Sequence, residues 1–375
     1  MLLRKTLKLW FLVTLCLGCQ SLPTSSSSQD PLKKPVVLAW NPVAMKHTRL
    51  GLSENHLRSE VLQQVVRESF PGVQSREVLR EASPDELAAF HTQRYIEEIK
   101  NTDVQKKFYR QDRWSPYVTS FAYSAAASAA AVTTDLLKDV YLGKAASGFA
   151  LVRPPGHHAV SDGPLGLCLF NNIAVAVKNL QRNHPHVKVA IVDIDAHHGN
   201  GIQDAFYETD QVLYVSTHQD SWPWSGKLEL SGEGKGRGTT INIPLPARSG
   251  DQTYAKVFAE IIVPAVKRFS PDILVVAQGY DSHWKDPQSF LQMTSTGQAE
   301  LAQNLVELAR QVTHGKVVFV LEGGYQLDVL KDGLHNTVNA LRGVQEVFDT
   351  MGPPMDVSEP DVRKLLQRLK KVHKL

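Results

Sequence analysis

The stretch Val187–Gly201, VKVAIVDIDAHHGNG, joins an apolar run to a cluster of charged and polar side chains. Its first half is short, β-branched and apolar throughout, which is typical of a strand buried on both faces of a parallel sheet. Its second half places two aspartates, two adjacent histidines and two glycines where that strand should end. Ligands bind beyond the carboxyl ends of the strands in open α/β sheets, so we interpret this stretch as a strand that leads into a functional site.

Four later stretches share the length and composition of this strand, namely QVLYVST, TTINIPL, DILVVAQG and KVVFVLEG. Patterns typical of helices lie between or after them, around residues 254–267, around residues 297–312 and beyond Leu327. This alternation predicts a three-layer α/β fold in which helices flank a mostly parallel sheet. Two of the later strands also end in polar motifs, GYDSH and EGGY, which would meet the first motif at one edge of the sheet.

Two helices are predicted upstream of these strands. The run FAYSAAASAAAVTTDLL, residues 121–137, is rich in alanine and predicts a long helix with a small face for close packing. The residues Ser83, Pro84, Asp85 and Glu86 have the order of a helix start, with a cap, a proline in the first turn and acids near the positive end of the dipole.

The composition is that of a globular protein. With 375 residues, 42% hydrophobic and 21% charged, the chain can form one large domain or two ordinary ones. The net charge of +3 is concentrated near the N-terminus, because Arg4, Lys5 and Lys8 lie in the first eighteen residues, which contain no acid. Without these three, the 41 Lys and Arg fall to 38, which equals the 38 Asp and Glu. A near-neutral protein lacks the basic surface that nucleic acid requires, so we expect no nucleic-acid partner.

Residues 1–18 are predicted to be a signal peptide, because basic residues precede an apolar run, Leu9 to Leu17, that is too short to span a bilayer. Residues 19–35 follow as a flexible tether rich in serine and proline. This order resembles a bacterial lipoprotein signal with Cys19 as the lipidated residue, and Gln20 resembles the type sent to the outer membrane. We therefore expect an exported protein, lipid-anchored at the cell envelope on the periplasmic side of the outer membrane. The alternative is an ordinary signal peptide with an incidental cysteine.

We expect no internal disulfide in the mature protein, even if it is exported. Of the three cysteines, Cys16 lies in the predicted signal and Cys19 would be lipidated, which leaves Cys168. A single cysteine cannot form an internal disulfide. We expect Cys168 to be a buried small side chain rather than a nucleophile.

Candidate metal ligands lie at two strand ends. Asp195 and His197 are two residues apart, and Asp281 belongs to a distant strand end. Two carboxylates and one imidazole that converge from separate loops leave a coordination position open, as expected of catalytic rather than structural zinc. We therefore predict one Zn²⁺ per chain, which Fe²⁺ or Co²⁺ could replace.

Candidate groups for proton transfer accompany these ligands. His157 and His158, in RPPGHHA, offer two imidazoles for acid–base work near neutral pH. Asp193 and Asn200 bracket the metal motif and are placed to orient them. Tyr325 follows two glycines, so its hydroxyl could enter a cleft and polarise a carbonyl.

Taken together, these stretches resemble the histone deacetylase family, which also includes acetylpolyamine amidohydrolases and bacterial acetoin-utilisation-type deacetylases. The matching motifs occur in the family's order, from roughly Val36 to Val347: RPPGHHA, GLCLFNN, VDIDAHHGNG, VSTH, GYDSHWKDP and LEGGY. Weaker similarities are NHLRSEVL and FHTQRYI near the N-terminus. The resemblance implies the arginase/deacetylase type of α/β fold, in agreement with the strand and helix pattern.

The resemblance also implies a role for each candidate residue. The zinc ligands would be Asp195, His197 and Asp281. The proton-transfer pair would be His157 and His158, with His158 acting first as base and then as acid. Asp193 would orient His157, and Asn200 would contact His158, where asparagine resembles the class II and bacterial branches. Tyr325 would donate a hydrogen bond to the substrate carbonyl.

Two further sites are implied. Gly166 and Leu167 would line the substrate tunnel, and Leu167 stands where the family commonly has an aromatic wall, so we expect a wider slot. The loop SWPWSGKLELSGEGKGRG, residues 221–238, is expected to form a rim. The family's monovalent-cation site, K⁺, would use the backbone carbonyls of three residues together with two hydroxyl side chains: Asp193, Asp195, His197, Ser216 and Thr217. The alternative for this last group is a plain hydrogen-bonded turn.

We therefore interpret residues 36–350 as a deacetylase-like catalytic domain that hydrolyses an acyl amide on an amine, with a water on the metal as nucleophile. The expected substrate is a small acylated amine or an acyl-lysine peptide. Residues 351–375 would form a tail with an amphipathic helix whose apolar face holds Leu365, Leu369 and Val372. Two alternatives remain: an arginase-like ureohydrolase, and a non-catalytic exported protein that binds acylated ligands. The sequence carries no signal for an oligomeric state.

Overall fold

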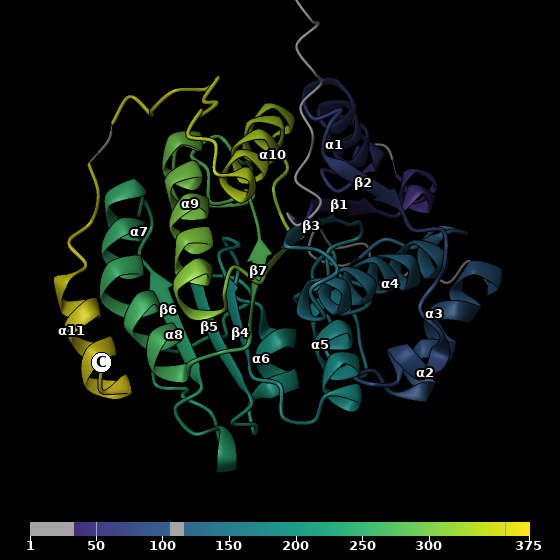
Figure 1. The fold of residues 1–375 in the computed structure, drawn as a ribbon, viewed down its shortest axis with the longest axis horizontal. Helices are drawn as coiled ribbons and strands as arrows, with labels where there is room; N and C mark the ends of the chain where they lie inside the picture. Colours follow the sequence, from purple (N-terminus) through teal and green to yellow (C-terminus); the bar gives the residue numbers. More distant parts are fainter. Residues whose placement is uncertain (1–33, 50, 106–115, 357) are drawn as a thin grey trace, which may run out of the picture. The chain divides into compact units, whose positions relative to one another are not determined.

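The computed structural model describes residues 34–49, 51–105, 116–356 and 358–375. In this part of the chain eight strands form one sheet in the order β2-β1-β3-β8-β7-β4-β5-β6, and each pairing is parallel (Figure 1). The strands are β1 (Val36–Trp40), β2 (Gln74–Glu77), β3 (Ser147–Leu151), β4 (Val189–Asp193), β5 (Val212–Gln219), β6 (Thr240–Leu245), β7 (Ile273–Gln278) and β8 (Val317–Leu321). The predicted three-layer α/β fold is confirmed, and all five predicted strands are present. The described sheet is wholly parallel, and β1 to β3 are additional to the predicted set.

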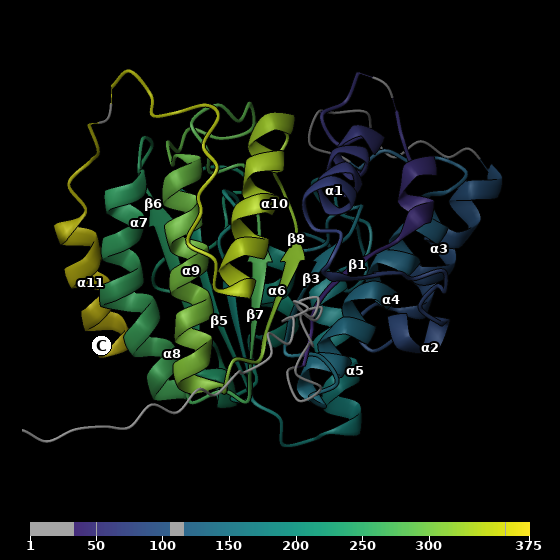
Figure 2. The same cartoon turned by 45° about the horizontal axis from the view of Figure 1, so that its top comes forward.

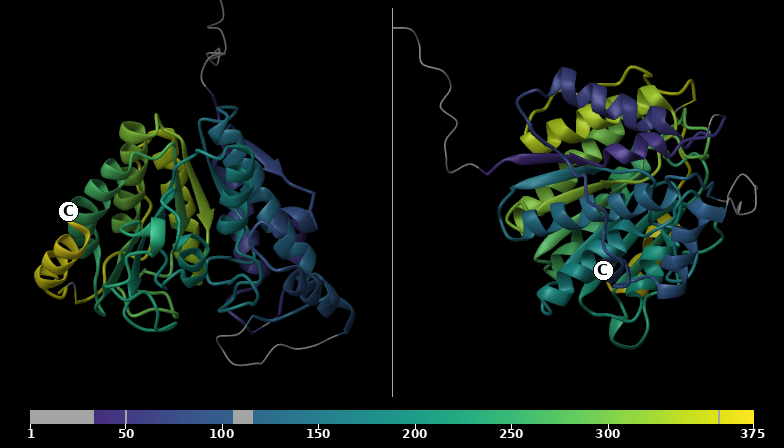
Figure 3. Two further views of the ribbon diagram at one scale, coloured as in Figure 1. Left: turned by 90° about the horizontal axis from the view of Figure 1, so that it is seen from below. Right: turned by 90° about the vertical axis from the view of Figure 1, so that its right-hand side faces the viewer.

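Helices cover both faces of this sheet (Figure 2). One face carries α1 (His56–Ser69), α7 (Asp251–Val257), α8 (Val263–Phe269), α9 (Ser295–Val312), α10 (Leu327–Arg342) and α11 (Arg363–His373). The other face carries α2 (Pro84–Leu87), α3 (Gln93–Gln105), α4 (Ala122–Tyr141), α5 (Asn172–Asn183) and α6 (Asn200–Phe206). Short 3₁₀ turns occupy Pro42–Lys46 and Gly234–Gly236. Figure 3 shows α11, in yellow, and the helices drawn in blue at opposite ends of the sheet.

The two layers explain why the central strands are apolar at each position. Along β4, Ala190 and Val192 pack into the hydrophobic cluster on one face, while Val189 and Ile191 pack into the cluster on the other. Because successive side chains of a strand point to opposite faces, a sheet that is covered twice needs an unbroken apolar run. The apolar side chains of these strands therefore form the core, and the candidate functional residues collect at or beyond the strand ends, as Asp193 does at the end of β4.

The alanine-rich run forms α4, which is nearly encircled by protein. Its alanines are fully buried, and it packs on α5 and against β1 and β3. Its approach to β3 is close at Gly148, where a Cβ atom would lie 2.7 Å from Leu136 Cδ1 and 2.7 Å from the carbonyl oxygen of Val37. The small residue in the sheet therefore makes room for Leu136, near the C-terminal end of α4.

The predicted helix at residues 254–267 is divided by a π-helical turn, Phe258–Ile262, between α7 and α8. Val263 N–H donates to the carbonyl of Phe258, five residues earlier. Pro264 has no N–H to donate and would clash with the preceding turn of a regular helix, so the wider turn accommodates it. The predicted start at Ser83 is confirmed, because Ser83 and Glu86 form a reciprocal capping box at α2.

The C-terminal helix α11 is present, but its buried face differs from the predicted one. Leu366, Leu369 and His373 are buried, whereas Val372 is exposed. These three residues are buried because this side of α11 packs on the π-helical turn, where Lys370 pairs with Glu260. In the described part of the chain, no helix has the length and apolar character needed to span a bilayer. The predicted signal peptide, Cys19 and the tether up to residue 33 lie outside the described residues.

We expect Gly148→Ala to lower the free energy of unfolding by about 1–3 kcal/mol, because the added methyl group overlaps Leu136 and the backbone of β1. Gly72→Ala is the matched control, since a Cβ atom at Gly72 meets nothing within 4 Å. The control should change stability by less than about 0.5 kcal/mol. Urea denaturation followed by circular dichroism measures both variants. Equal stability of the two would contradict the close packing of α4 on β3.

Candidate active site

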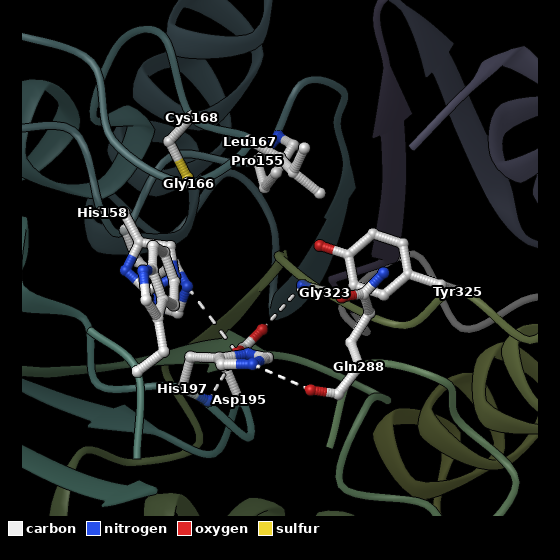
Figure 4. A pocket seen from close by; sticks show the side chains of 12 residues that line it. Pro155, His158, Gly166, Leu167, Cys168, Asp195, His197, Gln288, Gly323 and Tyr325 are labelled. Carbon is white, nitrogen blue, oxygen red and sulfur yellow. Dashed lines mark hydrogen bonds and ion pairs between the residues drawn. The ribbon is translucent and has the colours of Figure 1, made fainter. Parts of the chain in front are cut away.

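The carboxyl ends of four neighbouring strands, β3, β8, β7 and β4, meet at one pocket (Figure 4). The loop after β3 supplies the two histidines, β8 leads to Tyr325, β7 leads to Asp281 and β4 leads to Asp195 and His197. The pocket is lined by Pro155, His157, His158, Gly166, Leu167, Cys168, Asp195, His197, Trp222, Gln288, Gly323 and Tyr325. The predicted meeting of the strand-end motifs is therefore observed.

The three candidate metal ligands lie together below the pocket. Their ligand atoms are within 4.8 Å of one another, and all three residues are buried. His197 Nδ1 lies 3.2 Å from Asp195 Oδ1 and 3.0 Å from Asp281 Oδ2. The other ring nitrogen, Nε2, lies 3.2 Å from the carbonyl oxygen of Gln288 (Figure 4). A carbonyl can only accept, so Nε2 carries the proton and donates it there, which directs the Nδ1 lone pair toward the carboxylates.

The charges of this cluster call for a cation. Burial alone would lower the pKa of His197, but its hydrogen bonds to Asp195 and Asp281 raise it to about 10. Burial raises the pKa of Asp281, and the charge of Asp195 adds to that rise. Among the described residues, the ion pairs that reach these two carboxylates come from histidines and not from lysine or arginine. Two buried carboxylates and an imidazole fit a Zn²⁺ ion, which would take the place of the imidazole proton.

Backbone groups complete the cluster. Gly323 N–H donates to Asp195 Oδ2 at 2.7 Å, and Ala196 N–H donates to Asp281 Oδ1 at 2.9 Å. A Cβ atom at Gly323 would lie 2.4 Å from Asp281 Oδ2 and 2.6 Å from Asp195 Oδ2. The second residue of the EGGY motif must therefore be glycine, because its backbone packs directly on the carboxylates.

The two adjacent histidines have different partners. His157 Nδ1 lies 3.2 Å from Asp193 Oδ2, which also accepts a hydrogen bond from Tyr214 Oη at 2.9 Å. His158 Nδ1 lies 2.9 Å from Asn200 Oδ1. The ring centroids lie 4.0 Å apart, and the ring planes are tilted by 45° to each other. The structure thus brings together both pairs that the sequence predicted, Asp193 with His157 and Asn200 with His158.

The surroundings of the two rings shift their pKa values in opposite directions. Burial alone would lower the pKa of His157, but the carboxylates of Asp195 and Asp193 raise it to about 10. A cation bound by Asp195 would offset part of that rise. Burial lowers the pKa of His158 well below its ordinary value, and the positive charges of His157 and His197 lower it further. His158 is therefore the neutral imidazole of the pair.

Tyr325 lies on the opposite side of the pocket from His158 (Figure 4). Its backbone N–H donates to Asp286 Oδ2 at 2.6 Å. The guanidinium of Arg58 lies over its ring, 4.9 Å from the centroid. Burial raises the pKa of the Tyr325 hydroxyl well above its ordinary value, so this group is a hydrogen-bond donor at neutral pH.

Several supporting residues were not assigned a role from the sequence. Arg58 is fully buried and donates to the carbonyls of Glu322 and Gly324, on either side of Gly323. Glu322 Oε2 accepts from the backbone N–H groups of Gly156 and His157. These residues, with Asp286 and Gln288, lie in or next to motifs that were recognised, NHLRSEVL, LEGGY and GYDSHWKDP. The signal was therefore present, but the contacts that give each residue its role are tertiary.

The walls of the pocket differ in the kind of side chain that forms them. Gly166 and Leu167 line one part of it, as predicted. The aromatic surface comes from Trp222, in the loop expected to form a rim, whose ring meets His158 edge-on at 4.8 Å and His197 at 5.8 Å. The missing aromatic at Leu167 is thus accompanied by a large aromatic from the Trp222 loop.

Of the residues proposed for a monovalent cation, Ser216 and Thr217 lie within β5, next to the end of β4. Thr217 Oγ1 donates to the carbonyl of Asp193 at 3.3 Å, and Ser216 Oγ lies 2.8 Å from His218 Nδ1. Both residues are fully buried. Each hydroxyl group therefore has a protein partner, and the cation site stays a prediction.

Comparison with known proteins identifies the family to which this chain belongs. Residues 45–341 match the model of the histone deacetylase domain. The chain belongs to the histone deacetylase family. A solved structure of the HDA15 HD domain superposes with a TM-score of 0.79 at 28% sequence identity, covering 90% of this chain and 95% of that one.

Relatives of this chain include plant and archaeal proteins. Histone deacetylase 10, chloroplastic, of Oryza sativa subsp. japonica is 37% identical over 337 residues, which is 87% of this chain and 73% of that protein. Histone deacetylase 14, chloroplastic, of Arabidopsis thaliana is 46% identical over 60% of this chain and 54% of its own length. A probable deacetylase of Archaeoglobus fulgidus is 44% identical over 48% of this chain and 51% of its own. The matches thus span about half the length of two of these relatives.

We expect Asp281→Asn to weaken zinc binding by about 10- to 100-fold or more, because the amide removes one negative charge from the ligand set. Asn keeps an oxygen for the N–H of Ala196, so the fold should persist. Equilibrium dialysis with zinc analysis measures the change, and exposed Asp210→Asn is the matched control. Unchanged zinc affinity in Asp281→Asn would exclude this residue as a ligand.

Proposed function

We propose that this chain is a zinc-dependent deacetylase that hydrolyses the acyl amide of a small acylated amine or an acyl-lysine peptide. One observation carries the proposal: four neighbouring strand ends bring two buried carboxylates, three imidazoles and a tyrosine hydroxyl to one pocket. Membership of the histone deacetylase family supports the same reaction class.

Asp195, His197 and Asp281 would hold the metal. Bound there, Zn²⁺ would act as a Lewis acid toward the amide carbonyl and would lower the pKa of water. The protein supplies the geometry around it, because the carboxylates are held by backbone N–H groups and His197 is held by the carbonyl of Gln288. Fe²⁺ or Co²⁺ would fit the same donor atoms.

His158 would act as the general base. Asn200 Nδ2 donates to the carbonyl of His158 at 3.1 Å, so its Oδ1 faces Nδ1 of the ring. An amide oxygen can only accept, and Nδ1 therefore carries a proton. This leaves the lone pair on Nε2 to take a proton from the attacking water. The low pKa of His158 keeps the ring neutral and ready for this step.

His157 and Tyr325 would complete the reaction. Asp193 stabilises a protonated His157, so either this ring or the newly protonated His158 can donate a proton to the departing amine. The Tyr325 hydroxyl would donate to the carbonyl oxygen as it gains negative charge, which favours the transition state over the bound substrate.

Two other functions fit less well. A ureohydrolase of the arginase type would need a second metal site with extra aspartates, and the described cluster around His197 holds two, Asp195 and Asp281. A non-catalytic binding protein would not need the paired histidines, each fixed by its own partner.

We expect Tyr325→Phe to lower kcat about 100- to 1000-fold, because it removes one donor to the developing oxyanion. Zinc content and fold should not change, since the ring and its contact with Arg58 remain. A fluorogenic acetyl-lysine assay measures turnover, and Tyr141→Phe at the end of α4 is the matched control. Full activity in Tyr325→Phe would remove this hydroxyl from the mechanism, and absence of turnover in both forms would favour the binding protein.

We expect Asn200→Asp to shift the ascending limb of the pH profile of kcat/KM upward by about one unit or more. The added carboxylate raises the pKa of His158, so a larger fraction of the ring is protonated and unable to act as base at a given pH. Activity should therefore be lost as the pH falls, beginning at a higher pH than in the wild type. Exposed Asn183→Asp is the control. A limb that does not move would exclude His158 as the base.

We propose further that Cys19 anchors the protein to a membrane through lipid. Residues 1–18 and the tether that follows support this by their order of charge, apolar run and serine-rich segment. Expressed in a bacterial host, the wild type should fractionate with membranes, while Cys19→Ser should be soluble or unprocessed. Cys16→Ser should behave as the wild type. Equal amounts of wild type and Cys19→Ser in the soluble periplasmic fraction would contradict the anchor.

A further inference from the structure

A second group of metal-binding side chains lies beside the candidate zinc ligands. The sulfur of Cys168, an imidazole nitrogen of His157 and a carboxylate oxygen of Glu322 lie within 4.8 Å of one another, and all three residues are buried. They come from the loop after β3, the loop before α5 and the end of β8. The group shares no residue with the cluster of Asp195, His197 and Asp281.

The two oxygens of Glu322 have different surroundings. Oε2 accepts from Gly156 N–H at 2.7 Å and from His157 N–H at 3.0 Å. Oε1 is buried and has no hydrogen-bond partner among the described residues. Buried polar atoms are nearly always paired, and an unpaired carboxylate oxygen is costly. An atom with this environment is suited to bind a cation.

The sulfur of Cys168 is a free thiol that faces the same group. Burial holds the pKa of this thiol well above its ordinary value, and the carboxylate of Glu322 contributes. The backbone N–H groups of His158 and Ala159 favour the thiolate but do not outweigh these effects. A metal ion reverses the balance, since it binds the thiolate and displaces the proton.

The ring of His157 is already oriented as a ligand. Its Nδ1 pairs with Asp193 Oδ2, so Nε2, which lies 3.7 Å from Asp195 Oδ1, is the nitrogen left to bind an ion. Histidines that bind metals commonly donate their other N–H to a carboxylate in this way. Asp193 is itself fixed by the hydroxyl of Tyr214.

We propose that His157, Cys168 and Glu322 form a second site, which binds a thiophilic divalent ion such as Zn²⁺ and inhibits the enzyme. One sulfur, one nitrogen and one oxygen ligand select Zn²⁺ or Co²⁺ over Mg²⁺, which prefers oxygen ligands alone. Three protein ligands leave a fourth position for water. The site differs from the first in its thiolate, and this difference makes it detectable.

Inhibition follows from the identity of one ligand, and this part rests on the function proposed above. An ion on Nε2 of His157 occupies the lone pair or proton that this ring would contribute to catalysis. Activity should therefore rise with the first metal equivalent and fall as the second site fills.

The test uses Co²⁺ as a spectroscopic probe of the metal-free, full-length chain. Thiolate bound to Co²⁺ gives a charge-transfer band in the near ultraviolet, whereas the nitrogen and oxygen ligands of the first site do not. We expect this band in the wild type and in Asp281→Asn, and its loss in Cys168→Ser. Absence of the band in the wild type, or its persistence in Cys168→Ser, would overturn the proposal.

Two controls make the assignment specific. A chain with Cys16→Ser and Cys19→Ser should keep the band, which shows that neither N-terminal cysteine is its source. Glu322→Gln keeps an oxygen for Gly156 N–H but removes the negative charge. It should therefore lower the affinity for the Co²⁺ ion that gives the band by about tenfold or more. Equal affinity in Glu322→Gln would overturn the proposed ligand set. This variant also decides the matter if Cys168→Ser does not fold.

The activity measurement separates this proposal from the deacetylase function. For each variant, turnover of acetyl-lysine in excess Zn²⁺ is divided by turnover at one equivalent. The ratio should fall well below one in the wild type and return toward one in Cys168→Ser. A ratio of one in the wild type would overturn the inhibitory role. If no variant turns over acetyl-lysine, the deacetylase proposal fails, while the Co²⁺ band still decides whether the second site exists.

Discussion

Two buried aspartates impose the constraint that organises this site. Asp195 and Asp281 follow the neighbouring strands β4 and β7, and both carboxylates are buried. Like charges in such an environment are costly unless a cation and hydrogen-bond donors compensate them. Neighbouring groups compensate these charges. His197 places Nδ1 between the two carboxylates. The backbone N–H groups of Ala196 and Gly323 donate to the remaining carboxylate oxygens. The cluster thus has the charge and the hydrogen bonds that suit a cation, and the pocket lies above it.

The loops that converge on the site are held in place by hydrogen bonds between them. Arg58 binds carbonyls on both sides of Gly323, and Glu322 binds the backbone in front of the two histidines. Asp286 holds the N–H of Tyr325, while Gln288 of the same loop holds His197. The loops after β3, β7 and β8 are therefore fixed to one another by contacts of Arg58, Glu322, Asp286 and Gln288 with neighbouring backbone groups and with His197. Their burial in a protein interior makes these contacts geometrically strict.

The sequence predicts the groups whose chemistry is local and leaves out those whose role is tertiary. The five later strands are recognisable because burial on both faces demands apolar runs. By contrast β2, with the sequence QSRE, is a polar edge strand, and β3 contains Gly148, which suits the packing of α4 rather than strand formation. Carboxylates and histidines at strand ends were found by residue type. The roles of Arg58 depend on carbonyls 264 and 266 residues away, which no local pattern encodes.

The adjacent histidines show how partners rather than residue type assign a role. Both rings are buried and in contact, so burial alone would lower both pKa values. His157 faces the carboxylate of Asp193, which stabilises the protonated, charged ring. His158 faces the amide oxygen of Asn200, which fixes the proton of the neutral ring on Nδ1 but adds no charge. Each protonated ring also repels a proton from its neighbour, so the pair cannot readily carry two charges. A neutral imidazole next to a protonated one then follows from Asp193, at the end of β4, and Asn200, at the start of α6. The turn between these two residues also carries two of the candidate metal ligands, Asp195 and His197.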